Sequence, residues 1–585
     1  MPHQNAFAAF DKYPINGTIV PKHMKSFTFH KIQGKDGKAM PNLNKRNNFM
    51  KQAGVLAIAT ILCRIIGMLY RSPLLRIIGD EGNGYYSTAY NIYLILLVIS
   101  SYSIPSALSK EMAQRLSLGE YKNAQRTFYC AFIYVFFIGG ITGLLTYFGS
   151  NFLAENNSAV VLRVFAPTIF FSGFLGVFRG YFQARATMVQ TSVSQILEQL
   201  TNAIVSIVAA NYLIRAVAGS SPSVKAIYGA AGSAAGTGAG VVLALVFMLL
   251  IYLYNRDIIH RQLHRDLTGQ TESFGRIMGR IFLTVTPILF STFIYNINTT
   301  LNQTIYTRFC IDWLGRDQAE TAISYGVFSG KAIVISTIPI AIASAISAAA
   351  LPAIAGAHAQ GNQRETNRRI DTAIRSTMLL AFPAALGLAA LAQPIMQLLF
   401  PQKETLLLAA SLLRCLSLSV IFYSLSTLTN AILQGIGKVN LPVFNVLGSL
   451  LLQTAILLAL LFFTRWDLYS LAAAAVAYSL SMCILNNFFI RKYLSYRQNI
   501  SKTFLLPLAA SGAMAIAAVL FYWGAYKLCQ SNMISLLFSI PAAALIYFLL
   551  IIKLGCITED ELAGLPAGTL LLQIMRMLFR KPPAV

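Results

Sequence analysis

The sequence predicts an all-α polytopic membrane protein with fourteen transmembrane helices, arranged as two pseudo-symmetric six-helix lobes followed by two C-terminal helices. First, 56% of the 585 residues are hydrophobic and only 11% are charged, whereas about 25% charged residues is usual for a soluble domain. Second, apolar runs long enough for a membrane helix of about 20 residues recur along nearly the whole chain. Third, two distant stretches match each other without a gap, which indicates an internal repeat.

Short polar loops separate the apolar runs. The predicted spans are 50–78, 84–108, 124–149, 159–183, 188–214, 226–254, 276–304, 322–350, 368–392, 405–433, 440–463, 468–490, 503–526 and 533–554. Basic residues collect in every second loop, such as Lys110 and Arg115 after the second span and Arg179 and Arg185 at the end of the fourth. The other loops hold acidic residues such as Asp80. Because Lys and Arg favour cytoplasmic loops, this alternation places both termini in the cytoplasm.

The repeat defines the predicted division of the chain. Residues 162–184 and 413–435 match at a constant offset of 251, in the pairs Leu162 and Leu413, Arg163 and Arg414, Phe171 and Phe422, and Gln183 and Gln434. The offset spans six predicted helices, an even number, so both lobes have the same orientation and are parallel repeats. The predicted segments are a basic, disordered cytoplasmic tail (1–48), the N-lobe (49–255), a cytoplasmic linker (256–275), the C-lobe (276–495), two added spans (496–556) and an amphipathic cytoplasmic tail (557–585).

Two arginines inside the first span are the strongest functional candidates. Arg64 and Arg71 are seven residues apart, and seven steps of about 100° return a helix to within roughly 20° of its starting direction, so both side chains share one face. A charge at membrane depth costs about 2.5–3.5 kcal/mol on insertion scales and is usually functional. Carriers with repeated lobes bind substrate between the lobes. We therefore expect both arginines to line a cationic cavity that binds a phosphate-bearing substrate.

Other charged residues also lie within predicted spans. Lys331 in the eighth span is a further candidate for substrate binding, or else a buried structural partner. Arg163 and Arg414, at equivalent places in the fourth and tenth spans, are candidates for substrate binding, or else reach outward to the membrane surface. Glu198 in the fifth span is a candidate for proton or cation coupling, or else the ion-pair partner of an arginine.

Several function classes find no support in the sequence. The formal net charge of +25 fits Lys and Arg collected in cytoplasmic loops, and no nucleic-acid-binding module is recognisable. His260 and His264 are four residues apart but have no evident third ligand, so no metal site is predicted. We find no nucleophile–base pair, nucleotide motif or redox motif, so an enzyme is not predicted. The sequence favours a transporter.

The motifs then resemble a known group of transporters. The first span ends RSPLLRIIGDEGNGYYSTAYNIY, and IPSALSK follows the second span. With the tandem lobes, these stretches resemble the polysaccharide-exporter branch of the multidrug/oligosaccharidyl-lipid/polysaccharide superfamily, in particular stage V sporulation protein B and the MurJ-type lipid II flippases. The resemblance covers about residues 49–580 and implies a fourteen-span flippase of the bacterial cytoplasmic membrane.

The resemblance implies transport of lipid II, a lipid-linked peptidoglycan precursor, from the inner to the outer leaflet by alternating access. The family's first-span arginines match Arg64 and, with a one-residue slip, Arg71, and its charged position in the eighth span falls on Lys331. The family's acidic partner near that charge has no evident counterpart. The two added spans would help to form a groove for the lipid tail. Membrane lipids and proteins of cell-wall assembly are the implied partners.

The sequence is also compatible with two other transport functions. A flippase for another polyprenyl-diphosphate-linked glycan would need the same cationic cavity. A cation-coupled multidrug exporter would need an acidic cavity, for which Glu198 is the one suitable residue well inside a span. No bound cofactor is expected, and the membrane potential, H⁺ or Na⁺ are the candidate energy sources.

Overall fold

The computed structural model describes residues 43–555 apart from 103, 155, 186, 265, 267–270, 401, 439, 465 and 497. The predicted C-terminal tail and most of the predicted N-terminal tail lie outside the described residues. Every regular element in the described part of the chain is a helix, as the sequence predicts. Helices satisfy their backbone hydrogen bonds internally, which an apolar run in lipid requires.

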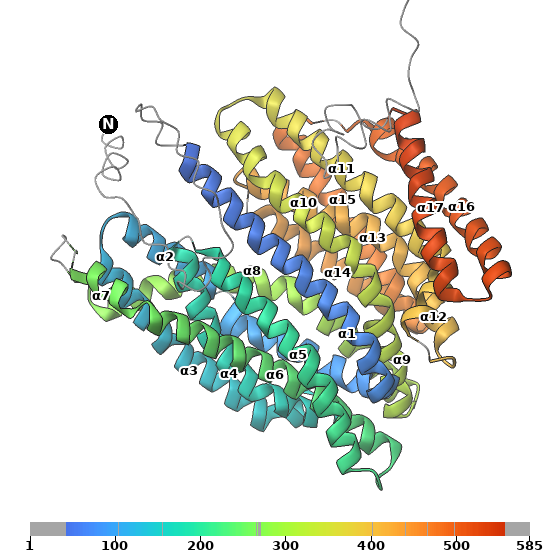
Figure 1. Ribbon diagram of the computed structural model, residues 1–585, viewed down its shortest axis with the longest axis horizontal. Helices are drawn as coiled ribbons and strands as arrows, with labels where there is room; N and C mark the ends of the chain where they lie inside the picture. Colours follow the sequence, from blue (N-terminus) through green and yellow to red (C-terminus); the bar gives the residue numbers. More distant parts are fainter. Residues whose placement is uncertain are drawn as a thin grey trace, which may run out of the picture.

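The helices follow one another with short connections (Figure 1). In chain order they are α1 (Leu43–Leu97), η3 (Val98–Tyr102), α2 (Ile104–Ser117), α3 (Tyr121–Leu153), α4 (Asn156–Ala184), α5 (Met188–Ala216), α6 (Pro222–Tyr254), α7 (Arg256–His264), α8 (Phe274–Arg308), η4 (Phe309–Trp313), α9 (Gln318–Val327), η5 (Phe328–Ile333), α10 (Val334–Ala359), α11 (Gln363–Ala390), α12 (Ala392–Leu399), α13 (Leu406–Gly435), α14 (Asn440–Phe463), α15 (Leu468–Leu494), η6 (Ser501–Leu505), α16 (Leu506–Cys529) and α17 (Asn532–Lys553). The segments marked η are short π-helical turns.

Twelve helices in the described part of the chain are long and apolar enough to cross a membrane. The first of them, Leu62–Leu116, includes most of the first two predicted spans. The helix α8, where span 276–304 is predicted, is not among the twelve. A polytopic helical membrane protein is therefore confirmed, while the count of fourteen spans stays a prediction.

The helix α1 bends sharply at Gly79. The backbone there has φ 70° and ψ 179°, which a glycine adopts readily because it has no Cβ. The bend divides α1 into a first part that ends at residue 78 and a second part that begins at residue 80. In Figure 1 the first part lies between α5 on one side and α10 on the other, and it contacts both.

The second part of α1 packs unusually closely against α9. A Cβ added at Gly84 would lie 2.0 Å from the carbonyl oxygen of Ala322, and one added at Gly326 would lie 2.2 Å from that of Asp80. Only glycine permits such backbone contact. This packing joins an early segment of the chain to a segment more than 200 residues later.

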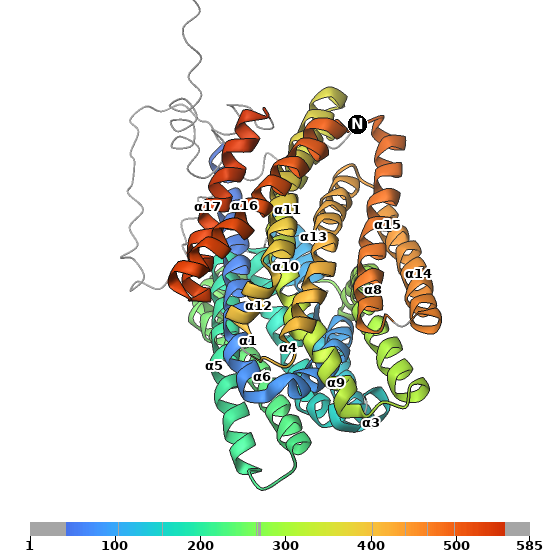
Figure 2. The same ribbon diagram turned by 90° about the vertical axis from the view of Figure 1, so that its right-hand side faces the viewer.

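Buried apolar side chains gather into clusters that draw mainly on neighbouring parts of the chain. One cluster joins α2, α3, α4, α6, α7 and α8. Another joins α10, α11, α13 and α15. A third combines segments from α8 to α15 with Leu75 of α1. The pair α16 and α17 lies at one edge of the bundle against α11 and α12 (Figures 1 and 2).

A charged cluster fixes the segment before α8 to the first helices. Arg115 at the end of α2 lies 2.7 Å from the Glu272 carboxylate, and Arg280 of α8 pairs with the same carboxylate. Arg126 donates to the Glu272 carbonyl at 2.7 Å. Burial raises the pKa of the Glu272 carboxyl, but hydrogen bonds from Arg115 and Arg280 outweigh burial, so the pKa lies below its usual value of 4.5.

We expect Glu272→Gln to lower the free energy of unfolding by about 1 kcal/mol, because both arginines lose a charged acceptor. The folded-state pKa of Glu272 is depressed, so its contribution is present above pH 4.5 and is lost as the pH falls through the folded-state value. Thermal unfolding of the solubilised protein at neutral and acidic pH measures both effects. The control is Glu365→Gln, which removes an exposed pair with Arg369 and should change little. Equal shifts for the two variants would contradict the prediction.

Candidate functional site

A cavity of about 840 Å³ lies between helices from the two halves of the chain. Its walls come from both parts of α1, from α4 and α5, and from α8, α9, η5 and α10. The charged side chains that line it are Arg64, Arg71, Arg179 and Glu198. Three guanidinium groups face one carboxylate, so this lining is net positive.

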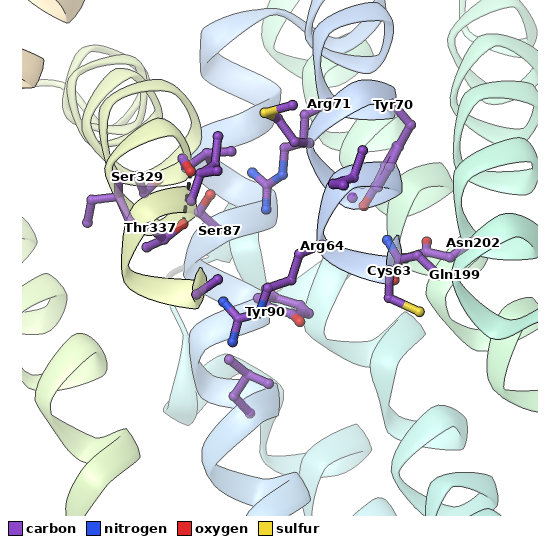
Figure 3. Close-up of a pocket in the computed structure, with 18 of the residues that line it drawn as sticks. Cys63, Arg64, Tyr70, Arg71, Ser87, Tyr90, Gln199, Asn202, Ser329 and Thr337 are labelled. Atoms are coloured by element: carbon purple, nitrogen blue, oxygen red, sulfur yellow. Dashed lines mark hydrogen bonds between the residues drawn. The ribbon is translucent and has the colours of Figure 1, made fainter. Parts of the chain in front are cut away.

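Arg64 and Arg71 both extend from the first part of α1 into this cavity (Figure 3). The heptad spacing predicts this shared direction. Arg64 is exposed, and its guanidinium forms no hydrogen bond or ion pair with another described residue. None of its guanidinium donors is used by another described residue, so these donors can bind a ligand.

Arg71 is held more firmly. Its Nη1 donates to Asn83 Oδ1 at 3.3 Å, and its guanidinium carbon lies 5.8 Å from the centre of the Tyr86 ring. A cation beside an aromatic face is stabilised by the ring's quadrupole. The residue is partly buried, with further guanidinium donors beyond the Asn83 bond for an anion to use.

Glu198 of α5 forms an ion pair with Arg179 of α4 at 2.7 Å. Arg179 Nε also donates to Ser194 Oγ at 3.0 Å. The ion pair corresponds to the second of the two roles considered for Glu198. The sequence pattern groups Arg179 with Arg185 among the basic residues of the cytoplasmic loops, because both stand near the end of a predicted span. The structure places Arg179 inside α4 and on the cavity wall.

Neutral polar groups complete much of the cavity lining. They include hydroxyl and amide side chains from α1, α5, α8, α9, η5 and α10: Tyr70, Tyr86, Ser87, Tyr90, Asn91, Gln195, Gln199, Asn202, Thr299, Tyr325, Ser329 and Thr337. Figure 3 shows Gln199 and Asn202 across the cavity from Ser329 and Thr337. Such groups donate and accept hydrogen bonds, as a sugar or peptide headgroup requires.

Lys331 does not line this cavity. Its side chain is 1% exposed, and its Nζ lies 2.8 Å from the Asp80 carboxylate and 2.7 Å from Thr405 Oγ1. The Thr405 hydroxyl donates to Asp80 Oδ2 at 2.7 Å. Asp80 is therefore the acidic partner of Lys331. This partner was not evident from the sequence, because Asp80 lies between two predicted spans and was expected in a loop. A buried charge needs such a partner.

Further hydrogen bonds join the bend region of α1 to the second half of the chain. Asn83, 2% exposed, donates to the Gly326 carbonyl at 2.7 Å. Gln402 donates to the Leu75 carbonyl at 3.0 Å. We call the contacts of Leu75, Asp80 and Asn83 with Gly326, Lys331, Gln402 and Thr405 the α1 seam. Asn83 connects the seam to the cavity, because its other amide atom binds Arg71.

Arg163 and Arg414 also lie away from the central cavity. Arg163 donates to Ser150 Oγ and to Asn151 Oδ1, both at 2.8 Å, which joins α4 to α3. Arg414 lines a second cavity of about 310 Å³ beside α12 and α16. The structure thus brings together Arg64, Arg71 and Glu198 and keeps the other three predicted site residues apart from them.

Comparison with known proteins now decides the family. A family model described as Lipid II flippase MurJ matches residues 125–542, which is more than half of the chain. The chain belongs to the MurJ family of lipid II flippases. Members of the MurJ family are transporters, so this is a transmembrane transport protein of cell-wall biogenesis and not an enzyme.

Two relatives from Bacillus subtilis (strain 168) agree with the MurJ assignment. Lipid II flippase MurJ is 24% identical over 493 residues, which cover 80% of this chain and 87% of the relative. Stage V sporulation protein B is 23% identical over 537 residues, which cover 89% and 98%. The resemblance found from the sequence motifs is therefore confirmed.

Solved structures agree on the fold. A structure of lipid II flippase MurJ in an inward closed conformation has a TM-score of 0.60 at 14% identity and covers 85% of this chain and 97% of its own. An inward-facing MATE family transporter of the MOP superfamily has a TM-score of 0.58 at 14% identity, covering 74% and 94%. The MurJ and MATE structures thus share their fold with this protein.

Proposed function

We propose that this protein moves lipid II from the inner to the outer leaflet of the cytoplasmic membrane by alternating access through the central cavity. The observation that carries the proposal is Arg64, whose guanidinium has no partner among the described residues and lies on the wall of a cavity between the two halves of a MurJ-family chain. A diphosphate that leaves water needs hydrogen-bond donors in the protein to replace those of water. The guanidinium group of arginine is positively charged and can donate two parallel hydrogen bonds to phosphate oxygens. The polyprenyl tail can stay in lipid while the headgroup crosses.

The proposal includes the finer architecture of fourteen spans, two six-helix lobes and two cytoplasmic termini. In this arrangement the α1 seam lies toward the outer face, since Asp80 and Thr405 fall at the outer ends of predicted spans. A closed seam would bar the outer exit while the headgroup enters from the inner side. Rocking of the lobes would then open the seam and close the inner side.

The charges also suggest how transport is driven. Each negative charge that moves outward with the cargo would gain about 2.3 kcal/mol per 100 mV of inside-negative potential. Protonation of Glu198 would in addition release Arg179 for the diphosphate, since the pair would lose its ionic component. We propose proteins of cell-wall assembly as the partners that supply and receive cargo, on the basis of family resemblance alone.

We expect Glu198→Gln to retain lipid II transport but to lose its dependence on pH. The amide keeps the shape of the side chain but carries no charge and does not titrate, so Arg179 lacks an ionic partner at every pH. Transport is measured in proteoliposomes at acidic and neutral pH. The control is Glu320→Gln, an exposed residue outside the cavity. Unchanged pH dependence in Glu198→Gln would exclude this residue as the coupling group.

Reconstitution tests the cargo itself. We expect purified protein in proteoliposomes to make fluorescent lipid II accessible to a reagent in the outer solution faster than empty vesicles do. A second polyprenyl-diphosphate-linked glycan is assayed in parallel, because both lipids carry the diphosphate that the cavity would bind. This assay tests the alternative that the protein transports another glycan lipid. If only the second lipid is transported, that lipid and not lipid II is the cargo. Export of cationic drugs without lipid transport would contradict the proposal.

A further inference from the structure

We propose that the second cavity, between α12, α13 and α16, binds the phosphate group of a lipid at the outer face of the membrane. This cavity measures about 310 Å³ and shares no lining residue with the central one. Its polar and aromatic lining residues are Gln393, Gln397, Arg414, Tyr522, Trp523 and Tyr526. The inference concerns a binding site outside the transport cavity and does not depend on which cargo is moved.

The charge of this second cavity points to an anionic ligand. Among the described residues that line it, Arg414 alone is charged. The guanidinium is exposed and forms no hydrogen bond or ion pair within the described part of the chain. An arginine at membrane depth is stabilised when it meets an anion, and a phosphate accepts two parallel hydrogen bonds from its fork.

The two walls beside Arg414 suit a headgroup rather than a hydrocarbon chain. Gln393 and Gln397 are four residues apart on α12, so both amides lie on one face. On α16, Tyr522 and Tyr526 are stacked with ring centres 5.9 Å apart, and Trp523 lies beside them. Tyrosine and tryptophan are enriched where a membrane meets water. The predicted topology places this end of α16 at the outer face.

The aromatic wall is fixed in position by bonds within the protein. Tyr522 donates its hydroxyl to Asn532 Oδ1 at 3.0 Å, and Asn532 donates its amide to the Pro394 carbonyl at 3.0 Å. These bonds join α16, α17 and α12. A cavity whose walls are already held needs little ordering when a ligand enters, which favours binding.

Trp523 gives a direct readout of binding. The chain has three tryptophans, so Trp313→Phe with Trp466→Phe leaves Trp523 as the only one. We expect dioctanoyl phosphatidic acid, added to this full-length protein in neutral detergent, to change the fluorescence saturably. Arg414→Gln should weaken the affinity at least about tenfold, because charged hydrogen bonds are lost. Arg215→Gln, which removes an exposed arginine at the end of α5, should leave the affinity unchanged.

The comparison of lipids identifies the source of the phosphate. Either of two outcomes would support the proposal. If a polyprenyl monophosphate binds more tightly than phosphatidic acid, the natural ligand is a carrier lipid. If phosphatidic acid binds more tightly than the polyprenyl monophosphate, the natural ligand is a bulk phospholipid. Equal binding of dioctanoylglycerol, which has no phosphate, would overturn the proposal, as would full affinity in Arg414→Gln. Arg414→Lys keeps the charge and should retain part of the affinity, which provides a second variant if the glutamine variant fails to fold. Because binding is measured without transport, this outcome is independent of the cargo assay.

Discussion

Arg64→Ala is expected to lower the rate of lipid II transport about 10- to 100-fold while the protein still folds. No described residue pairs with the Arg64 guanidinium, so its removal should cost little stability. A diphosphate in the cavity would lose one or two charged hydrogen bonds, each worth about 1.5–3 kcal/mol, and about 1.4 kcal/mol corresponds to a tenfold change. Transport of fluorescent lipid II in proteoliposomes measures the effect.

Arg64→Lys separates the loss of the paired guanidinium hydrogen bonds from the loss of charge, and Arg76→Ala is the control. Arg64→Lys keeps a positive charge but cannot bind two phosphate oxygens in parallel, so we expect an intermediate rate. Arg76→Ala removes an exposed arginine of the same helix that does not line the cavity, and it should transport normally. Wild-type transport by Arg64→Ala at equal expression would show that the cavity does not bind cargo through this residue.

Removal of one partner from the buried Asp80–Lys331 pair is expected to have the largest effect on stability. Asp80→Asn or Lys331→Met should each lower the free energy of unfolding by about 3–5 kcal/mol, because an uncompensated charge remains in the interior. Thermal unfolding in detergent measures this loss. The matched control is Asp312→Asn, which breaks an exposed pair with Arg308 and should change the stability by less than about 1 kcal/mol.

The double variant Asp80→Asn with Lys331→Met tests the role of the pair in transport. With both charges gone the interior no longer holds an unpaired ion, so most of the stability should return. The α1 seam should nevertheless be weaker and open more often toward the outer face. Cys63 lines the central cavity, so a membrane-impermeant maleimide added outside should label it faster once the other six cysteines are replaced by serine. Unchanged labelling would mean that the pair supports the fold and does not control access.

Local sequence patterns predicted the membrane helices and the shared direction of Arg64 and Arg71. Both depend on short-range geometry, namely the length of apolar runs and the angular spacing along a helix. The same patterns placed Asp80 in a loop, because it lies between the predicted spans 50–78 and 84–108. It is in fact half of a buried ion pair, since the bend at Gly79 leads directly into the next helix and not into a loop.

Long-range contacts were beyond the reach of these patterns. The partner of Asp80 lies 251 residues away, and no periodicity connects two positions so far apart. Arg179 was missed for a different reason, since counting basic residues near a span end cannot distinguish the last turns of a helix from the loop that follows. Arg414 was found as a membrane charge, but its cavity is formed by α12 and α16, whose arrangement the sequence did not indicate.

The two hydrogen bonds of Asn83 have a consequence for the tightness of the membrane. One joins Arg71 in the cavity, and the other joins the Gly326 carbonyl in the seam. If the phosphates of the cargo draw Arg71 away, the Asn83 side chain loses its hydrogen bond to Arg71. That bond helps to hold the Asn83 amide against α9. An empty transporter would keep that bond and stay shut, so the cell would not lose its ion gradients through an unoccupied passage.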